Sequence, residues 1–77
     1  MTVEIITPEK NLFAGEAESL IVPALDGEMG ILNHHAPIIS ALKAGNVKLR
    51  TNGKEEIFEI NGGVLEVNSN KVIVLAE

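Results

Sequence analysis

The sequence contains no cysteine, tryptophan or tyrosine among its 77 residues. The absence of cysteine excludes a disulfide scaffold and any thiolate-bound zinc or iron–sulfur site. Only two aromatic residues, Phe13 and Phe58, are present, which is too few for a platform on which nucleic-acid bases could stack. The longest apolar run, residues 20–25, is far shorter than the ~18 residues that a membrane-spanning helix needs. No basic segment followed by an apolar one opens the chain, so we expect no secretory signal.

Basic residues are also scarce. Six Lys and Arg stand against eleven Asp and Glu, giving a net charge of -5, which argues against direct nucleic-acid binding. The excess lies entirely in residues 1–40, which hold one lysine and six acidic residues. This acidic half could steer a basic partner toward the protein, or it could simply keep a small domain soluble. The charge pattern alone leaves both roles open.

What is present is a series of short, strand-like segments. They occupy residues 3–7, 12–14, 19–22, 46–51, 54–60, 64–67 and 71–75. Turn signals separate them about every 8–10 residues, a spacing typical of an all-β sandwich or barrel. Asn52-Gly53 is the strongest of these signals, because a type I′ hairpin turn needs positive φ at both positions. We therefore predict one all-β domain covering residues 1–77.

Some segments are less regular. The nearly continuous apolar run at 19–22 predicts a strand buried on both faces, and Gly15 is expected to end the strand before it. Residues 36–44 fit either a helical turn or a short strand. Residues 23–37 hold two of the seven glycines, two of the three prolines and both histidines, so we expect a functional loop there.

Residues 23–37 contain one candidate for a metal-binding site. Two histidines and a carboxylate, here His34, His35 and Glu28, can bind zinc or non-haem iron. Adjacent residues of a strand point to opposite faces, however, and the chain has no third histidine. A small metal-dependent β-barrel enzyme using these three residues is therefore the weaker alternative, and a soluble ligand-binding sandwich is another. The residues favour a small acidic sandwich without an active site, used for binding or assembly.

Three strings of the sequence stand out: Gly27-Glu28-Met29-Gly30-Ile31, His35-Ala36-Pro37 and Leu42-Lys43-Ala44-Gly45. With weaker matches at 6–8, 13–15, 62–67 and 72–76, they resemble the epsilon subunit of the F-type ATP synthase. Together they cover essentially the whole chain in the family's order. The resemblance implies a two-sheet β-sandwich of about ten short strands, with no catalytic residue and no cofactor.

The resemblance also implies a role. The chain would be a non-catalytic rotor (central stalk) subunit that links the gamma subunit to the membrane c ring and couples proton flow to ATP synthesis. It would lie at the cytoplasmic face of the bacterial inner membrane, peripheral to the membrane through the complex. The chain ends at Glu77, where the family's C-terminal helical hairpin begins, so we expect no helix-borne inhibition and no nucleotide binding from this chain.

Contact residues follow from the family's motifs. The loop facing the c ring corresponds to Glu28 and Met29, and c-ring loops are typically basic, which gives an acid there an electrostatic reason. The residues that match the gamma-facing surface are Thr7, Leu12, His35, Ala36, Pro37 and Ile39.

Overall fold

The computed structural model describes residues 1–77 as nine strands without a helix. The strands are β1 (Thr2–Ile6), β2 (Asn11–Glu16), β3 (Ser19–Ala24), β4 (Gly27–Leu32), β5 (Ile38–Leu42), β6 (Gly45–Thr51), β7 (Lys54–Ile60), β8 (Gly63–Asn68) and β9 (Lys71–Ala76). Nothing in the chain is a helix long and apolar enough to cross a membrane. The all-β fold predicted from the sequence is confirmed, with nine strands where about ten were expected.

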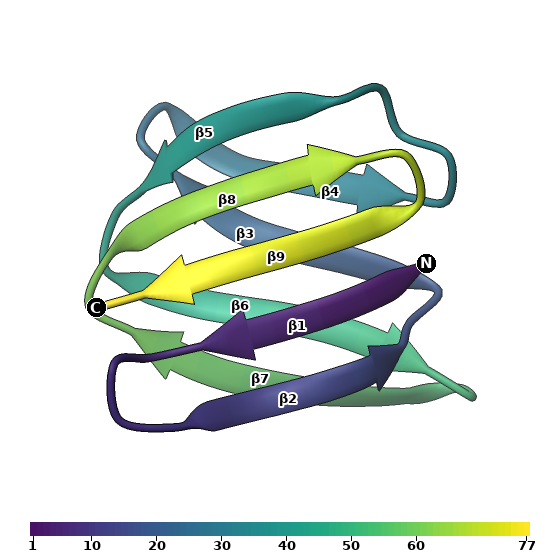
Figure 1. Ribbon diagram of the computed structural model, residues 1–77, viewed down its shortest axis with the longest axis horizontal. Coiled ribbons are helices and arrows are strands. Elements are labelled where there is room, and N and C mark those ends of the chain that lie inside the picture. The colour runs from purple at the N-terminus through teal and green to yellow at the C-terminus, as the bar shows by residue number, and fades with distance from the viewer.

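The strands form two layers packed face to face (Figure 1). Sheet I, at the front, has the order β2-β1-β9-β8-β5, and sheet II, behind it, has the order β4-β3-β6-β7. A single pair, Ala24 opposite Leu42, joins the two sheets through β3 and β5. All neighbouring strands run antiparallel except β1 and β9, which pair in parallel from Thr2 opposite Lys71 to Ile6 opposite Leu75.

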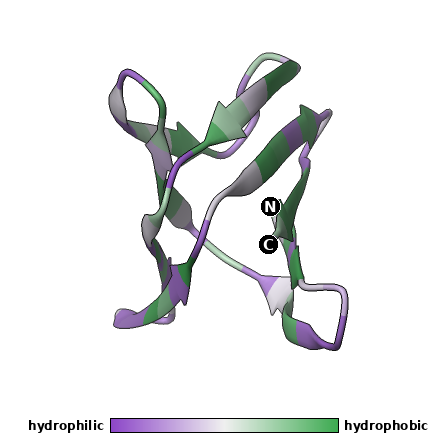
Figure 2. Ribbon diagram, turned by 90° about the vertical axis from the view of Figure 1, so that its left-hand side faces the viewer, coloured by the Kyte–Doolittle hydropathy of each residue, from purple (hydrophilic) through white to green (hydrophobic).

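The space between the sheets holds the core. Seventeen buried apolar side chains form one cluster there, and no polar or charged residue is buried. Side chains alternate along each strand with a period of two, so one face of every strand supplies the core and the other meets solvent. Val3 and Ile5 of β1 and Val72 and Val74 of β9 follow this rule. Figure 2 shows the two layers from the side, with hydrophobic and hydrophilic segments alternating along the ribbons. The outer faces of both sheets are thus the surfaces available for function.

The turn between β6 and β7 is the one that the sequence predicts. Asn52 and Gly53 have φ values of 53° and 76°, the positive angles that a type I′ turn requires. Thr51 and Lys54 face each other directly across it. This turn sets the register of the whole β6–β7 pair.

The strand β3 corrects one prediction. Residues 19–22 were expected to be buried on both faces, but Ile21 is 36% exposed, whereas Leu20 and Val22 are fully buried. The prediction was wrong because β3 lies in a sheet whose outer face is uncovered. Gly15 also does not end its strand, since β2 continues through it to Glu16.

The segment 23–37 is mostly strand rather than loop. β3 and β4 form a hairpin paired without interruption from Ser19 opposite Leu32 to Ala24 opposite Gly27. Only residues 33–37 are irregular before β5 begins at Ile38. The expectation of one long loop was wrong because the Gly-rich stretch of this segment pairs with β3 as a complete strand. Residues 38–42 form a strand, which resolves the choice left open by the sequence.

Candidate interaction surfaces

Glu28 lies on the outer side of sheet II, in the strand β4 rather than in a turn. It stands opposite Pro23 in the β3–β4 hairpin. Its side chain is 64% exposed, and its carboxylate lies 3.7 Å from the Nζ atom of Lys48 on β6. Exposed ion pairs of this kind stabilise a fold by ~0–1 kcal/mol. Because the pair is weak, a cation from a partner could replace Lys48 at small cost.

Met29 faces the other way. It is half-buried and packs against the core, since alternation along β4 turns it inward between its neighbours Glu28 and Gly30. Of the two residues proposed for a c-ring contact, only Glu28 presents its side chain to the outer surface.

The outer face of sheet I carries an apolar row that runs across four strands. Ala41 of β5, Val64 of β8, Leu75 of β9 and Ile6 of β1 stand opposite one another in turn. We call these four residues the outer row. Val64 is 41% and Leu75 51% exposed, and the neighbouring Ile39 is 75% exposed. Contiguous exposed apolar side chains on a small protein mark an interaction surface.

The residues proposed for a gamma contact do not come together at one place. Thr7 lies in the turn that joins β1 to β2 and Leu12 is the second residue of β2, whereas His35 to Pro37 lie in the connection before β5. β2 and β5 are opposite edges of sheet I, and the two groups are also at opposite ends of the strands (Figure 1). Ile39 alone among them lies on the outer face beside the outer row.

Thr7 and Leu12 have structural roles of their own. The Thr7 hydroxyl accepts a hydrogen bond from the backbone N–H of Lys10 at 3.1 Å and lies 3.1 Å from the Lys10 carbonyl oxygen. Leu12 packs against the core. Thr7 thus helps to close the β1–β2 turn, and Leu12 anchors the start of β2 on the core.

A shallow hollow of about 360 Å³ adjoins Ile39 where β5 lies beside β8. Its lining consists of Pro37, Ile38, Ile39, Glu66, Val67 and Asn68. The hollow contains one carboxylate and no histidine or nucleophilic side chain, so its chemistry suits a partner's side chain rather than a reaction.

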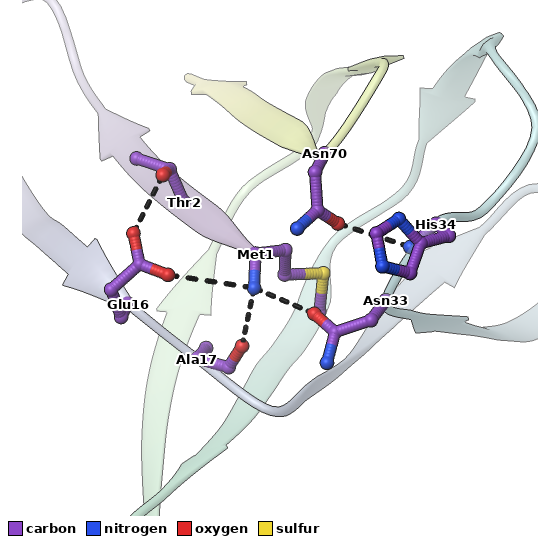
Figure 3. A network of polar contacts seen from close by, with 7 residues as sticks. All are labelled: Met1, Thr2, Glu16, Ala17, Asn33, His34 and Asn70. Atoms are coloured by element: carbon purple, nitrogen blue, oxygen red, sulfur yellow. Dashed lines mark hydrogen bonds and ion pairs between the residues drawn. The ribbon is translucent and has the colours of Figure 1, made fainter.

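His34 belongs to a corner where several turns are joined by hydrogen bonds (Figure 3), and His35 follows it in the chain. The backbone N–H of His34 donates to Oδ1 of Asn70 at 3.0 Å, and His34 has a positive φ of 63°. Nδ1 of His35 lies 2.7 Å from the Ala36 carbonyl oxygen. Beside them, Oδ1 of Asn33 accepts a 2.6 Å hydrogen bond from the Met1 ammonium.

These histidines do not form a metal site with Glu28. Glu28 lies near the start of β4 and His34 beyond its end. The structure has no group of three or more His, Asp or Glu side chains placed to hold a metal ion. The metal-dependent enzyme considered from the sequence therefore has no ligand set here.

Glu16 is the one titratable group whose pKa is clearly displaced. The Thr2 hydroxyl donates a 2.6 Å hydrogen bond to its carboxylate, which is the main cause of a pKa below the ordinary value of 4.5. The Met1 ammonium, 3.6 Å away, lowers the pKa further, while partial desolvation opposes both effects. The arrangement ties the end of β2 to the start of β1 (Figure 3).

Sequence reasoning missed the outer row, Lys48 and Asn70. The apolar run 72–76 conceals the outer row, because Leu75 looks like a core residue until its alternation with the buried Val72 and Val74 is known. Lys48 could have been found from its outward position in the alternating segment 46–51. Its pairing with Glu28 crosses from β6 to β4, and no sequence signal gives that distance.

Comparison with known families gives one match over the whole chain. The family described as "ATP synthase, Delta/Epsilon chain, beta-sandwich domain" matches residues 1–77. A protein named ATP synthase epsilon chain from Chlorobium limicola is 47% identical over 97% of this chain, which spans 86% of that protein. The protein of the same name from Brevibacillus brevis is 42% identical over 100% of this chain, which spans only 59% of its length.

Solved structures share the fold. A chain from the central stalk and c-ring structure of the Tetrahymena thermophila mitochondrial ATP synthase superposes with a TM-score of 0.84 at 20% identity. The superposition covers 99% of this chain and 62% of that one. A chain of the Euglena gracilis mitochondrial ATP synthase gives 0.89 at 22% identity, covering 96% of this chain and 48% of that one. At these identities the likeness establishes the architecture.

Proposed function

The chain belongs to the β-sandwich family of ATP synthase delta and epsilon chains, and from this membership we propose that it is a non-catalytic rotor subunit that links the gamma subunit to the c ring. In this role it transmits torque and so couples proton flow to ATP synthesis. A close-packed sandwich suits the task because its interior deforms little under load. The complex would hold it at the cytoplasmic face of the bacterial inner membrane.

The observation that carries the proposal is the presence of two separate surfaces on opposite sheets. The outer row and Ile39 form an apolar face on sheet I. The β3–β4 hairpin belongs to sheet II, behind sheet I (Figure 1). It presents the exposed side chain of Glu28. A subunit that joins two partners needs two separate surfaces, so that both partners can bind at the same time. We assign the apolar face to gamma and the acidic hairpin to the c ring.

Binding to purified gamma tests the first assignment. Leu75→Ser and Ile39→Ser should each weaken the affinity for gamma, because each removes apolar area from the proposed interface. Ile57→Ser is the matched control, since Ile57 is 54% exposed on the outer side of β7 in sheet II. Equal binding by all three variants would refute the apolar face as the gamma interface, and no binding by the folded wild-type chain would refute the function.

The coupling of ATP hydrolysis to proton pumping tests the second assignment. In reconstituted vesicles Glu28→Lys should lower the number of protons pumped per ATP more than Glu28→Gln, because charge reversal adds repulsion where neutralisation only removes attraction. The difference should shrink at high salt. Glu55→Lys is the control, because Glu55 forms a comparable ion pair, 3.9 Å from Arg50, at the far end of sheet II. Unchanged coupling in both Glu28 variants would show that this carboxylate does not contact the c ring.

A further inference from the structure

The chain contains the dipeptide Asn-Gly twice, in two different surroundings. Asn52-Gly53 forms the turn between β6 and β7, and Asn61-Gly62 joins β7 to β8. The main-chain nitrogen of the residue after an asparagine can attack the side-chain amide, and a glycine there has no side chain to hinder the approach. Asparagine is for this reason one of the thermally labile residues of proteins. The fold decides which of the two pairs can react.

The fold leaves Asn52-Gly53 free to react. Both residues are exposed, and neither the side chain of Asn52 nor the backbone N–H of Gly53 takes part in a hydrogen bond. Apart from its neighbours in the chain, no atom lies within 4 Å of the place where a Cβ of Gly53 would stand. The nitrogen and the amide carbon can therefore meet by rotation within the turn, and exposed turns open at the lowest cost.

Asn61-Gly62 is held by its surroundings. Gly62 is buried, and its carbonyl oxygen accepts a 2.9 Å hydrogen bond from the backbone N–H of Glu77. A Cβ on Gly62 would lie only 3.4 Å from the carbonyl oxygen of Leu42. Ring closure needs the peptide between Asn61 and Gly62 to rotate, so the packed chain around it has to open first.

We propose that Asn52 is a deamidation site of the folded protein. The nitrogen of Gly53 forms a bond to Cγ of Asn52, the bond from Cγ to Nδ2 breaks, and ammonia leaves with the proton of the Gly53 N–H. The resulting succinimide takes up one water molecule. Cleavage at the former main-chain carbonyl gives isoaspartate, whose backbone runs through Cγ, and cleavage at Cγ gives aspartate. The modification needs no partner and is independent of the rotor function proposed above.

Isoaspartate at residue 52 disrupts the β6–β7 turn. It inserts an extra methylene group into the main chain of a two-residue turn whose φ angles are 53° and 76°. Turn length and type set the register of a hairpin, here from Thr51 opposite Lys54 onward. Isoaspartate should therefore lower the melting temperature. Aspartate tolerates a positive φ, so the second product should leave the melting temperature nearly unchanged.

The test ages the folded wild-type chain at mildly alkaline pH and follows both Asn-Gly pairs by peptide mass spectrometry. Asn52 should deamidate at least about tenfold faster than Asn61, because the chain around Gly62 has to open before it can react. In denaturant the two asparagines should react at similar rates. A carboxyl methyltransferase specific for isoaspartate, supplied with labelled S-adenosylmethionine, should label the aged protein at residue 52.

Two variants connect the modification to stability. Asn52→Gly is the matched control for ageing, because glycine adopts the same φ and has no amide to lose. Asn52→Asp carries the new charge without the extra methylene group. The aged wild-type protein should melt at a lower temperature than before ageing, whereas aged Asn52→Gly and fresh Asn52→Asp should melt close to the fresh wild type.

The proposal fails if Asn52 and Asn61 react at equal rates in the folded chain, or if Asn52 reacts only in denaturant. An equal loss of melting temperature in aged wild type and aged Asn52→Gly would refute the predicted effect on the turn. A melting temperature of Asn52→Asp as low as that of the aged wild type would assign the effect to charge and would also contradict the role of the extra methylene group.

Discussion

At the residue scale, Glu16 shows how one exposed hydrogen bond makes stability depend on pH. The Thr2 hydroxyl holds its pKa below 4.5 in the folded chain. A carboxyl with a lowered folded pKa contributes stability that is fully present above its unfolded pKa and is lost as pH falls through the folded value. The contribution of Glu16 therefore belongs to pH values above 4.5.

We predict that Thr2→Val lowers the melting temperature near neutral pH and that the difference from wild type shrinks as the pH falls below 4.5. The reason is that protonation of Glu16 removes the same charge-assisted hydrogen bond in the wild-type protein. Thermal unfolding followed by circular dichroism between pH 7 and pH 3 measures this. A difference that stays constant over the range would mean that Thr2 acts through packing.

Gly53 gives the second prediction at this scale. With φ at 76°, a β-branched residue at this position is strained. Gly53→Val should destabilise the protein by about 1 kcal/mol or more, measured by denaturant unfolding, while the folded fraction still binds gamma. Asn52→Gly is the control, because glycine also adopts the φ of 53° found at Asn52. Retained stability with lost binding would show that the turn serves the partner instead of the fold.

At the scale of elements, β2 and β7 depend on a contact between the layers. The rings of Phe13 and Phe58 lie with centroids 6.0 Å apart and planes tilted by 56°, within the range of centroid distances at which aromatic pairs attract one another. β2 ends sheet I and β7 ends sheet II, so this pair closes the sandwich where both layers have a free edge.

We predict a coupling free energy of about 0.5–1.5 kcal/mol between Phe13 and Phe58. A double-mutant cycle with Phe13→Leu, Phe58→Leu and the double variant, followed by denaturant unfolding, measures it. Leucine retains most of the apolar volume, so the cycle isolates the contact between the rings. Additive effects of the two substitutions would show that each ring packs independently against the core.

Comparison of individual strands shows which parts of the fold can be predicted from the sequence. The alternation of 46–51 and the Asn52-Gly53 turn predict β6, β7 and their register, because both signals are local. The exposure of Ile21 and Leu75 cannot be predicted in this way, since it depends on whether another layer covers the outer face. For the site, the motif of 27–31 points to Glu28, but Lys48 follows from a pairing between distant strands.

At the scale of the whole molecule, the small core predicts modest stability. A chain of 77 residues buries only roughly 60% of the surface that its unfolded form exposes, and no disulfide supports it. Binding of gamma to the folded state should therefore raise the melting temperature, by an increment that grows with gamma concentration. Differential scanning fluorimetry with increasing gamma checks this, with Leu75→Ser as the weakened control. A melting temperature that saturating gamma leaves unchanged would contradict the proposed assembly.

The parallel pairing of β1 with β9 has a consequence for synthesis on the ribosome. β9 lies between β1 and β8 in the middle of sheet I, so β1 gains its second neighbour only after β9 has been made. Val3 pairs opposite Val72, and closing a loop of that length is entropically costly and slow. The nascent chain therefore leaves the exit tunnel with one edge of β1 unpaired until residues 71–76 emerge. During that interval the unpaired edge of β1 is open to pairing with another chain.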